Sequence, residues 1–251
     1  MISGPRSIVL FSCLLLALSG AAFALSRLYT PERTVDLTPP AAYVGAPVPP
    51  QADPGTALRR TQLVDEDWLR RTSRATGIPS PALRAYADAQ LSGVGGCDVG
   101  WTTLAGIGWI ESQHGTLGGR TIDAQGRSSS AILGPALDGS GDFAAIRSTA
   151  ASRAWHGDAT WEHAVGPMQF LRSSWEPWAA DGDRDGTIDP HDLDDAAATA
   201  ARYLCAGGRD LARGDGWASA VLSYNHSDEY VAAVHAAASA YAERAAGRRA
   251  G

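Results

Sequence analysis

The sequence predicts a single all-α domain, and two observations lead to that fold class. Apolar residues recur at helical spacing in several segments that carry helix start or stop signals, whereas alternation with a period of two occurs only in scattered pieces. The chain has 251 residues, 45% of them hydrophobic, and eight tryptophans, which is the apolar content of a folded protein. With a low-complexity front set aside, the remaining length fits one compact domain.

Start and stop signals locate the expected helices. Ser80 followed by Pro81 predicts a helix start, with serine as the N-cap and proline in the first helical position. Residues 173–176 fit a capping box that opens a short helix. Further helices are expected at about 102–114, 192–204, 216–224 and 227–245. The segment 120–163 is rich in glycine and serine and weakly periodic, and a long loop of this kind is often functional.

The front of the chain predicts export. Arg6 supplies a basic start, residues 8–18 an apolar stretch, and residues 22–24 an Ala-Phe-Ala cleavage site. The alternative is a retained membrane anchor, because the apolar run approaches the length that spans a bilayer. In both cases we expect the folded part to lie outside the cytoplasm. The predicted division of the chain is 1–25 as signal peptide or anchor, 26–60 as a proline-rich linker, 61–246 as the folded domain and 247–251 as a tail.

Charge and cysteine content narrow the class of protein. The formal net charge is −6, and the sequence has no basic stripe to neutralise a phosphate backbone, so we expect no nucleic-acid partner. Of the three cysteines, Cys13 lies in the predicted signal, which leaves Cys97 and Cys205. In an oxidising compartment this pair is expected to form one disulfide, and the alternative is two buried free thiols.

One carboxylate falls on an apolar helix face. On a helix, four residues lie at i, i+3, i+4 and i+7, namely Leu104, Ile107, Gly108 and Glu111. Burial on that face raises the pKa of the Glu111 carboxyl, which suits a general acid near neutral pH. Gly108, one turn earlier, is expected to leave room for a substrate. The alternative is a glutamate at an exposed helix end.

Two further stretches concentrate polar side chains. A Gly-Pro turn leads into Met168 and Gln169 just ahead of the short helix, an arrangement that can hold an amide rigidly at a cleft. A helix junction at 223–230 contains Tyr224, Asn225, His226 and Tyr230. The alternative for the junction is ordinary capping, since Ser227 is a natural N-cap.

Residues 181–192 follow the twelve-residue calcium loop of EF-hand proteins. Expected ligands are the side chains of Asp181, Asp183, Asp185, Asp189 and Asp192 and the main-chain carbonyl of Thr187. Gly186 makes the sharp turn at the sixth position, and the departure from the pattern is Asp192 in place of a bidentate glutamate. We expect a structural Ca²⁺ that braces the cleft, and the alternative is a solvated acidic loop.

Taken together, three motifs resemble the lytic murein transglycosylases of the family B type, which have a goose-lysozyme-like catalytic core. They are Glu-Ser-x-x-Gly at 111–115, Gly-Pro-Met-Gln-Phe at 166–170 and Tyr-Asn-x-Ser at 224–227, in the family's order. The resemblance covers roughly residues 81–241. It implies a lysozyme-like all-α domain that cleaves the β-1,4 bond between N-acetylmuramic acid and N-acetylglucosamine in peptidoglycan glycan strands.

The resemblance also implies a role for each matching residue. Glu111 is the catalytic acid and base, and the sugar-binding positions are Ser112, Met168, Gln169, Tyr224, Asn225 and Tyr230. The implied reaction is non-hydrolytic and yields 1,6-anhydromuramyl products. The alternatives are a hydrolytic muramidase, with Asp158 or Glu162 as the second carboxylate, and a catalytically silent wall-binding protein. We expect a monomer without an organic cofactor.

Overall fold

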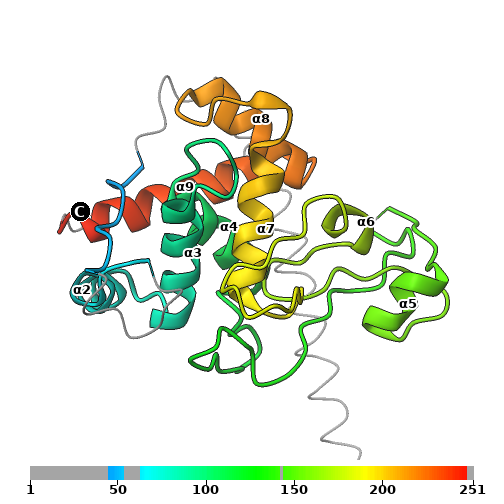
Figure 1. Ribbon diagram of the computed structural model, residues 1–251. Coiled ribbons are helices and arrows are strands. Elements are labelled where there is room, and N and C mark those ends of the chain that lie inside the picture. Colours follow the sequence, from blue (N-terminus) through cyan, green and yellow to red (C-terminus); the bar gives the residue numbers. More distant parts are fainter. Residues whose placement is uncertain (1–44, 54–62, 142–143, 248–251) are drawn as a thin grey trace, which may run out of the picture. The chain divides into compact units, whose positions relative to one another are not determined.

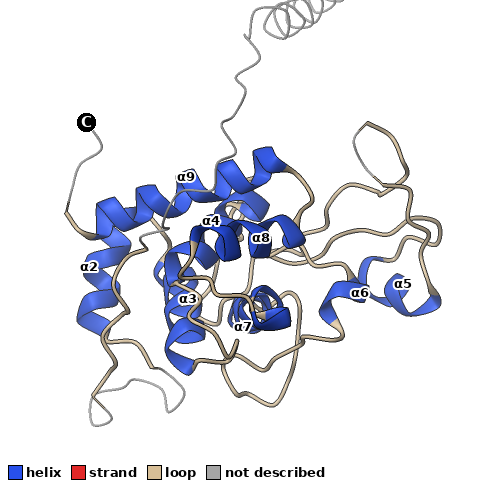
Figure 2. Cartoon of the chain, turned by 90° about the horizontal axis from the view of Figure 1, so that it is seen from above, coloured by secondary structure: helices blue, strands red, loops and turns tan. Residues whose placement is uncertain are grey.

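The computed structural model describes residues 45–53, 63–141 and 144–247. Within these ranges it contains helices and isolated β-bridges but no strand, which confirms the all-α prediction. The helices, shown in Figures 1 and 2, are α2 (Glu66–Thr76), α3 (Ser80–Ser92), α4 (Trp101–Ser112), α5 (Ala150–His156), α6 (Arg172–Trp175), α7 (Leu193–Leu204), α8 (Gly214–Tyr224) and α9 (Asp228–Ala245), with a 3-10 turn η1 (Ala206–Gly208). The predicted signal or anchor lies outside the described residues.

Helix α4 forms the centre of the domain. Its residues from Trp101 to Gly108 are all buried, and it packs against α9 and α3. A helix that is apolar on every side is stable only inside a core, which explains this position. Gly106 permits the close approach of α9, because a Cβ there would lie 2.9 Å from the Val234 carbonyl oxygen. The C-terminal turn of α4 emerges from this core, and it carries Glu111.

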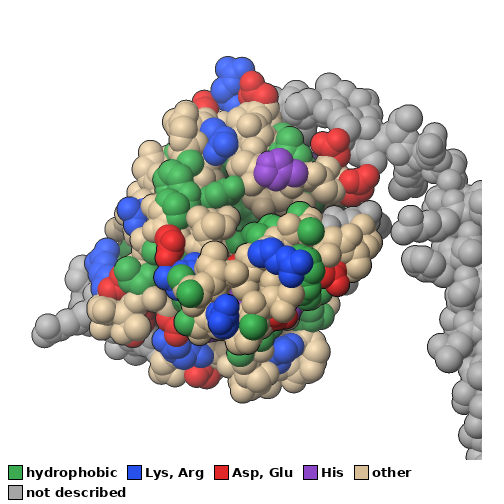
Figure 3. Space-filling model, turned by 90° about the vertical axis from the view of Figure 1, so that its right-hand side faces the viewer, with side chains coloured by type: hydrophobic (Ala, Val, Ile, Leu, Met, Phe, Trp, Pro, Cys, Tyr) green, Lys and Arg blue, Asp and Glu red, His purple; other side chains and the backbone are tan. Residues whose placement is uncertain are grey.

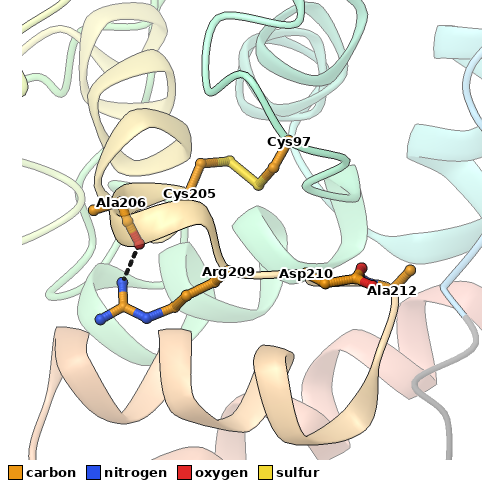
Figure 4. The surroundings of a disulfide bond; sticks show 6 residues. All are labelled: Cys97, Cys205, Ala206, Arg209, Asp210 and Ala212. Carbon is orange, nitrogen blue, oxygen red and sulfur yellow. Dashed lines mark hydrogen bonds between the residues drawn. A yellow bond between two sulfur atoms is a disulfide. The ribbon is translucent and has the colours of Figure 1, made fainter.

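Helix α7 packs against α3, and several of its small side chains are buried in the core. Ala197, Ala200 and Ala201 are fully buried there. The Asp192 carboxylate caps the N-terminus by accepting a hydrogen bond from Asp194 N. At the other end, Cys205 forms a disulfide with Cys97, with the Cα atoms 5.6 Å apart (Figure 4). The predicted disulfide is confirmed, and it links the loop after α3 to the end of α7.

The segment between α4 and α7 has little regular structure. It is held by isolated bridges such as Leu133 with Val165 and Arg147 with Trp161, and it includes α5 and α6. Both ribbon views place α5 and α6 to one side of the central helices (Figures 1 and 2). The long loop predicted at 120–163 therefore contains one short helix, α5, that the sequence pattern did not predict.

Several boundaries differ from the prediction. Ser80 is the first residue of α3, and Pro79 occupies the N-cap position. The predicted capping box at 173–176 is wrong, because α6 begins at Arg172 and its N-cap, Leu171, has no side-chain hydrogen bond. Helix α2 was not predicted. None of the helices in the described part of the chain is long and apolar enough to span a membrane.

Candidate active site

Glu111 lies in the last turn of α4, half-buried where that helix leaves the core. The Tyr230 hydroxyl, from the first turn of α9, donates a 2.5 Å hydrogen bond to Glu111 Oε1. Burial raises the pKa of the Glu111 carboxyl to about 7, and the hydrogen bond from Tyr230 opposes part of that rise. A carboxyl group with this pKa is protonated often enough at neutral pH to donate a proton, and it accepts one readily afterwards.

Gln169 is held in an unusual backbone conformation. Its φ is +50°, and it follows a turn at Gly166 with φ of +76°. The Gln169 amide Nε2 donates to the Gly166 carbonyl oxygen at 2.9 Å. The side chain also packs against Gly134, where a Cβ would lie only 2.6 Å from Gln169 Oε1. The predicted rigid amide is therefore present, half-buried and fixed on two sides.

Ser112 and Met168 were predicted to bind sugar, but both are fully buried. The Ser112 hydroxyl donates to the Pro167 carbonyl oxygen at 2.6 Å and accepts from Gly115 N at 2.8 Å. The Met168 carbonyl oxygen accepts from the Tyr224 hydroxyl at 2.8 Å. These hydrogen bonds join the end of α4, the loop at 166–169 and the end of α8. Ser112 and Met168 therefore hold the elements of the site together and do not face its surface.

Gly108 does not leave room for a substrate, contrary to the sequence-based expectation. A Cβ at this position would lie 2.0 Å from the Tyr86 hydroxyl oxygen. The space beside Gly108 is therefore filled by a buried tyrosine of α3. The glycine is explained by packing inside the core.

Tyr203 of α7 and Tyr224 of α8 extend the site beside Gln169. Asn225 follows the last residue of α8 and is exposed. A cavity of about 80 Å³ lies next to Gln169 and is lined by Gln169, Phe170, Leu171, Ser174, Tyr203 and Tyr224. No sequence motif surrounds Tyr203, and the signal that could have indicated it is an aromatic residue on the helix predicted at 192–204. Figure 3 shows the face that includes α5 and α6, on which hydrophobic side chains are interspersed with arginine and acidic side chains.

The two residues considered as a second catalytic carboxylate, Asp158 and Glu162, both have hydrogen-bond partners in the segment around α5. Asp158 accepts hydrogen bonds from Thr160 N and Trp161 N and pairs with His163 at 3.1 Å. Glu162 is 6% exposed and accepts a hydrogen bond from Ser152. Each carboxylate thus stabilises the segment around α5.

The acidic loop brings three carboxylates together. One oxygen each from Asp181, Asp183 and Asp195 lies within 4.8 Å of the others. Gly186 has a φ of +90°, which allows the sharp turn that was expected at the sixth loop position. The group consists of oxygen donors alone, as hard cations such as Ca²⁺ prefer.

Two of the predicted ligands have other partners. Arg127 pairs with Asp189 at 2.6 Å and with Asp192 at 3.3 Å, and Asp192 also caps α7. In their place the loop gains Asp195, from the first turn of α7. Burial raises the pKa of the Asp195 carboxyl to about 7, so a divalent cation beside it would favour the ionised form.

The acidic loop also contacts the loop that holds Gln169. A Cβ on Gly166 would lie 1.9 Å from the Pro190 carbonyl oxygen, so the two main chains are in direct contact. On its other side, Leu193 N donates to the Gly126 carbonyl oxygen at 3.1 Å. The candidate metal loop is therefore packed against the candidate active site.

Part of the chain matches a known protein family. Residues 145–222, which include Gln169 and the acidic loop, match the family described as Transglycosylase SLT domain. The match confirms the resemblance to the lytic transglycosylases predicted from the sequence.

Among solved structures, the chain is similar to two of the Escherichia coli lytic transglycosylase SLT35, one in complex with bulgecin A and one in complex with calcium. Both are 17% identical in sequence to this chain. Each alignment covers 71% of this chain and 75% of the SLT35 chain, with TM-scores of 0.40 and 0.41, respectively. No curated protein matches the chain.

Proposed function

We propose that this protein is a peptidoglycan lytic transglycosylase. It cleaves the bond between N-acetylmuramic acid and N-acetylglucosamine without water and forms 1,6-anhydromuramyl ends. The observation that carries this proposal is Glu111, whose pKa is raised to about 7 by burial and whose carboxylate accepts a hydrogen bond from Tyr230. The transglycosylase match over residues 145–222 supports the reaction class.

The reaction uses one carboxyl group twice. Protonated Glu111 donates its proton to the glycosidic oxygen while the bond from that oxygen to the muramyl C1 breaks. The positive charge that develops at C1 is shared by the N-acetyl group of the same sugar. The Glu111 carboxylate then removes the proton from the muramyl C6 hydroxyl, and O6 bonds to C1. The carboxyl group is protonated again, and no water has been consumed.

The surrounding residues orient the glycan. Gln169 and Asn225 offer amide groups to the sugar and its N-acetyl group, and Tyr224 and Tyr203 line the adjoining cavity. Ser112 and Met168, given their burial, hold the 166–169 loop in place of contacting sugar. A Ca²⁺ bound by Asp181, Asp183 and Asp195 would supply charge neutralisation and rigidity, and no chemical step.

We infer that the enzyme acts outside the cytoplasm, on the cell wall. The Cys97–Cys205 disulfide is typical of an oxidising compartment outside the cytoplasm. We therefore place the enzyme as a monomer on peptidoglycan, either released by cleavage of residues 1–25 or retained by them.

The proposal is tested by incubating the full chain with purified peptidoglycan and weighing the released muropeptides by mass spectrometry. Transglycosylation yields muramyl ends that are one water lighter than the ends left by hydrolysis. Products with ordinary reducing ends would make the protein a muramidase. Binding to the wall without any release would make it a wall-binding protein.

Tyr230→Phe is expected to move the alkaline limb of the rate profile to higher pH. Glu111 must start protonated, so kcat is high below its pKa and falls as pH rises through about 7. The Tyr230 hydroxyl stabilises the carboxylate, and its removal raises that pKa further. The measurement is kcat against pH for both chains. A limb in the variant that stays in place or moves to lower pH would contradict this role of Tyr230.

Gly134→Ala is expected to reduce activity more than stability. The added Cβ would lie 2.6 Å from Gln169 Oε1 and displace the amide, and the cost in unfolding free energy is that of its hydrogen bond to the Gly166 carbonyl oxygen, about 1 kcal/mol. We expect kcat/KM to fall about tenfold, which corresponds to about 1.4 kcal/mol of transition-state binding. Gly100→Ala is the control, since it also adds a Cβ, at an ordinary backbone φ of −69° and with the nearest atom, the Thr102 hydroxyl oxygen, 3.7 Å away. Equal kcat/KM in both variants would argue against Gln169 as a binding group.

A further inference from the structure

A buried histidine that the proposed mechanism does not use lies three residues after Glu111. His114 is 3% exposed and lies between two tyrosines of different helices. Its Nδ1 is 3.1 Å from the Tyr86 hydroxyl of α3, and its Nε2 is 2.8 Å from the Tyr241 hydroxyl of α9. We call this arrangement the His114 bridge. It connects the end of α4 to α3 and α9, the two helices that pack most extensively against α4. Figure 2 shows these three helices together.

The two hydrogen bonds define the tautomer of His114. Tyr86 is fully buried, so its hydroxyl proton needs an acceptor, and the acceptor within reach is Nδ1 of His114. The proton of the neutral ring is then on Nε2, which donates to Tyr241. Burial lowers the pKa of His114 to about 3, so the ring stays neutral throughout the pH range in which Glu111 titrates. The bridge is therefore a fixed support and takes no proton from the reaction.

The backbone around His114 is held in a conformation that needs such support. Gln113, His114 and Gly115 have φ values of +52°, +61° and +84°, so three successive residues are left-handed. Residues other than glycine persist in this region only where their surroundings hold them. This turn ends α4 directly after Glu111 and Ser112, and Gly115 N donates to the Ser112 hydroxyl that contacts Pro167.

The bridge also contacts the last turn of α4, which carries Glu111 and is called the catalytic turn below. The Tyr86 hydroxyl fills the space next to Gly108, one turn before Glu111 on the same helix. The other side of the turn is fixed by Ser112. Loss of the bridge would therefore leave the last turn of α4 attached to the 166–169 loop through Ser112 and to α9 through the Tyr230–Glu111 hydrogen bond, but without its tie to α3 and its second tie to α9.

We propose that His114 is a positioning residue that fixes the last turn of α4, and through it the Glu111 carboxylate, by joining Tyr86 and Tyr241. This inference rests on the proposed transglycosylase activity. It assigns His114 no contact with substrate. An error of about 1 Å in the position of a catalytic group can cost about 100-fold in rate. Loss of the bridge is therefore expected to lower kcat. Substrate binding depends on Gln169 and Asn225 and should change little.

The test compares His114→Leu with His114→Gln in the full chain, using initial rates of cleavage of a soluble glycan prepared from peptidoglycan. Glutamine keeps one hydrogen-bond acceptor and one donor. It also tolerates a left-handed backbone conformation, which the neighbouring Gln113 adopts. Leucine removes both hydrogen bonds. We expect kcat to fall about 10- to 100-fold in the leucine variant with KM within about threefold, and to recover most of that loss with glutamine.

Thr103→Val is the matched control for loss of stability. It removes the acceptor of a buried 3.0 Å hydrogen bond from Trp217 Nε1 near the start of the same helix, far from the catalytic turn. We expect its Tm to fall while kcat stays near that of the unchanged chain. If the leucine variant does not fold, Tyr241→Phe removes only the acceptor of the Nε2 proton and should lower kcat about 3- to 10-fold.

The outcomes separate this proposal from the proposed function. An unchanged kcat in the folded leucine variant, or an equal loss of kcat in Thr103→Val, would overturn the positioning role and leave the transglycosylase activity standing. A complete absence of cleavage by the unchanged chain would overturn the activity and the positioning role together.

Discussion

Replacing Glu111 by glutamine is expected to lower the rate of glycan cleavage by at least about 1,000-fold. General acid and base steps each contribute about 100- to 10,000-fold, and this one residue is assigned both of them. Glutamine preserves the shape of the side chain but can neither donate a proton to the glycosidic oxygen nor remove one from the C6 hydroxyl. Binding to peptidoglycan should persist, because the amide groups of Gln169 and Asn225 are unchanged.

The measurement is the initial rate of muropeptide release, together with sedimentation of the protein with intact peptidoglycan. Glu176→Gln is the control, since it neutralises an exposed carboxylate that pairs with Arg172. The Tm of Glu111→Gln should equal or exceed that of the unchanged chain, because burial of a charged carboxylate carries a desolvation cost that a neutral amide lacks. Retention of a tenth of the original rate would exclude Glu111 as the acid.

Removal of divalent cations is expected to produce the largest loss of stability. A ligand present at 100 times its Kd stabilises the folded state by about 2.7 kcal/mol, which for a domain of this size corresponds to roughly 5 to 11 °C in Tm. Asp181, Asp183 and Asp195 lie close enough to share one cation, and without it their negative charges repel one another. We expect Ca²⁺ to raise Tm and a chelator to lower it.

The same treatment should affect the active site through packing. The Pro190 carbonyl lies directly against Gly166, so loosening the acidic loop loosens the turn that holds Gln169. Asp183→Asn should abolish the response of Tm to Ca²⁺, whereas Asp210→Asn, outside the loop, should preserve it. An identical Tm with Ca²⁺ and with chelator in the unchanged chain would show that the loop is only a solvated acidic turn.

Helices with strong local signals were predictable from the sequence. The helical pattern at 192–204 predicted α7, and Ser227, a natural N-cap, predicted the start of α9. Helix α2 has equally clear signals, with Asp65 capping its start and Gly77 in a left-handed conformation after its end. These local signals are sufficient to predict α2 from the sequence as well.

The metal loop shows where a local motif is insufficient. The twelve-residue pattern names Asp189 and Asp192, but both pair with Arg127, more than 60 residues away in sequence. A linear motif cannot show that a distant guanidinium competes for its carboxylates. Asp195 lies with Asp181 and Asp183 because its carboxylate accepts hydrogen bonds from Gly182 N and Asp189 N of the loop, a geometry that depends on how α7 begins.

The candidate site divides in the same way. The motifs predicted Glu111 as the catalytic residue and Gln169 as a sugar-binding residue, and the structure places the hydroxyl of Tyr230, also predicted to bind sugar, on the Glu111 carboxylate. The motifs did not distinguish residues that face the cleft from residues that support it. Ser112 and Met168 belong to the supporting residues, because both are fully buried. Burial of a small polar side chain is decided by tertiary packing, which the linear pattern does not contain.

The central claim is that one carboxyl group completes the reaction without water, and cleavage in water enriched with ¹⁸O tests it most directly. Peptidoglycan is digested by the unchanged chain in this solvent, and each new muramyl end is weighed by mass spectrometry. We expect unlabelled 1,6-anhydro ends, because O6 of the sugar itself bonds to C1. One ¹⁸O atom at each new end would mean that solvent water attacks C1, which would contradict the single-carboxylate mechanism assigned to Glu111.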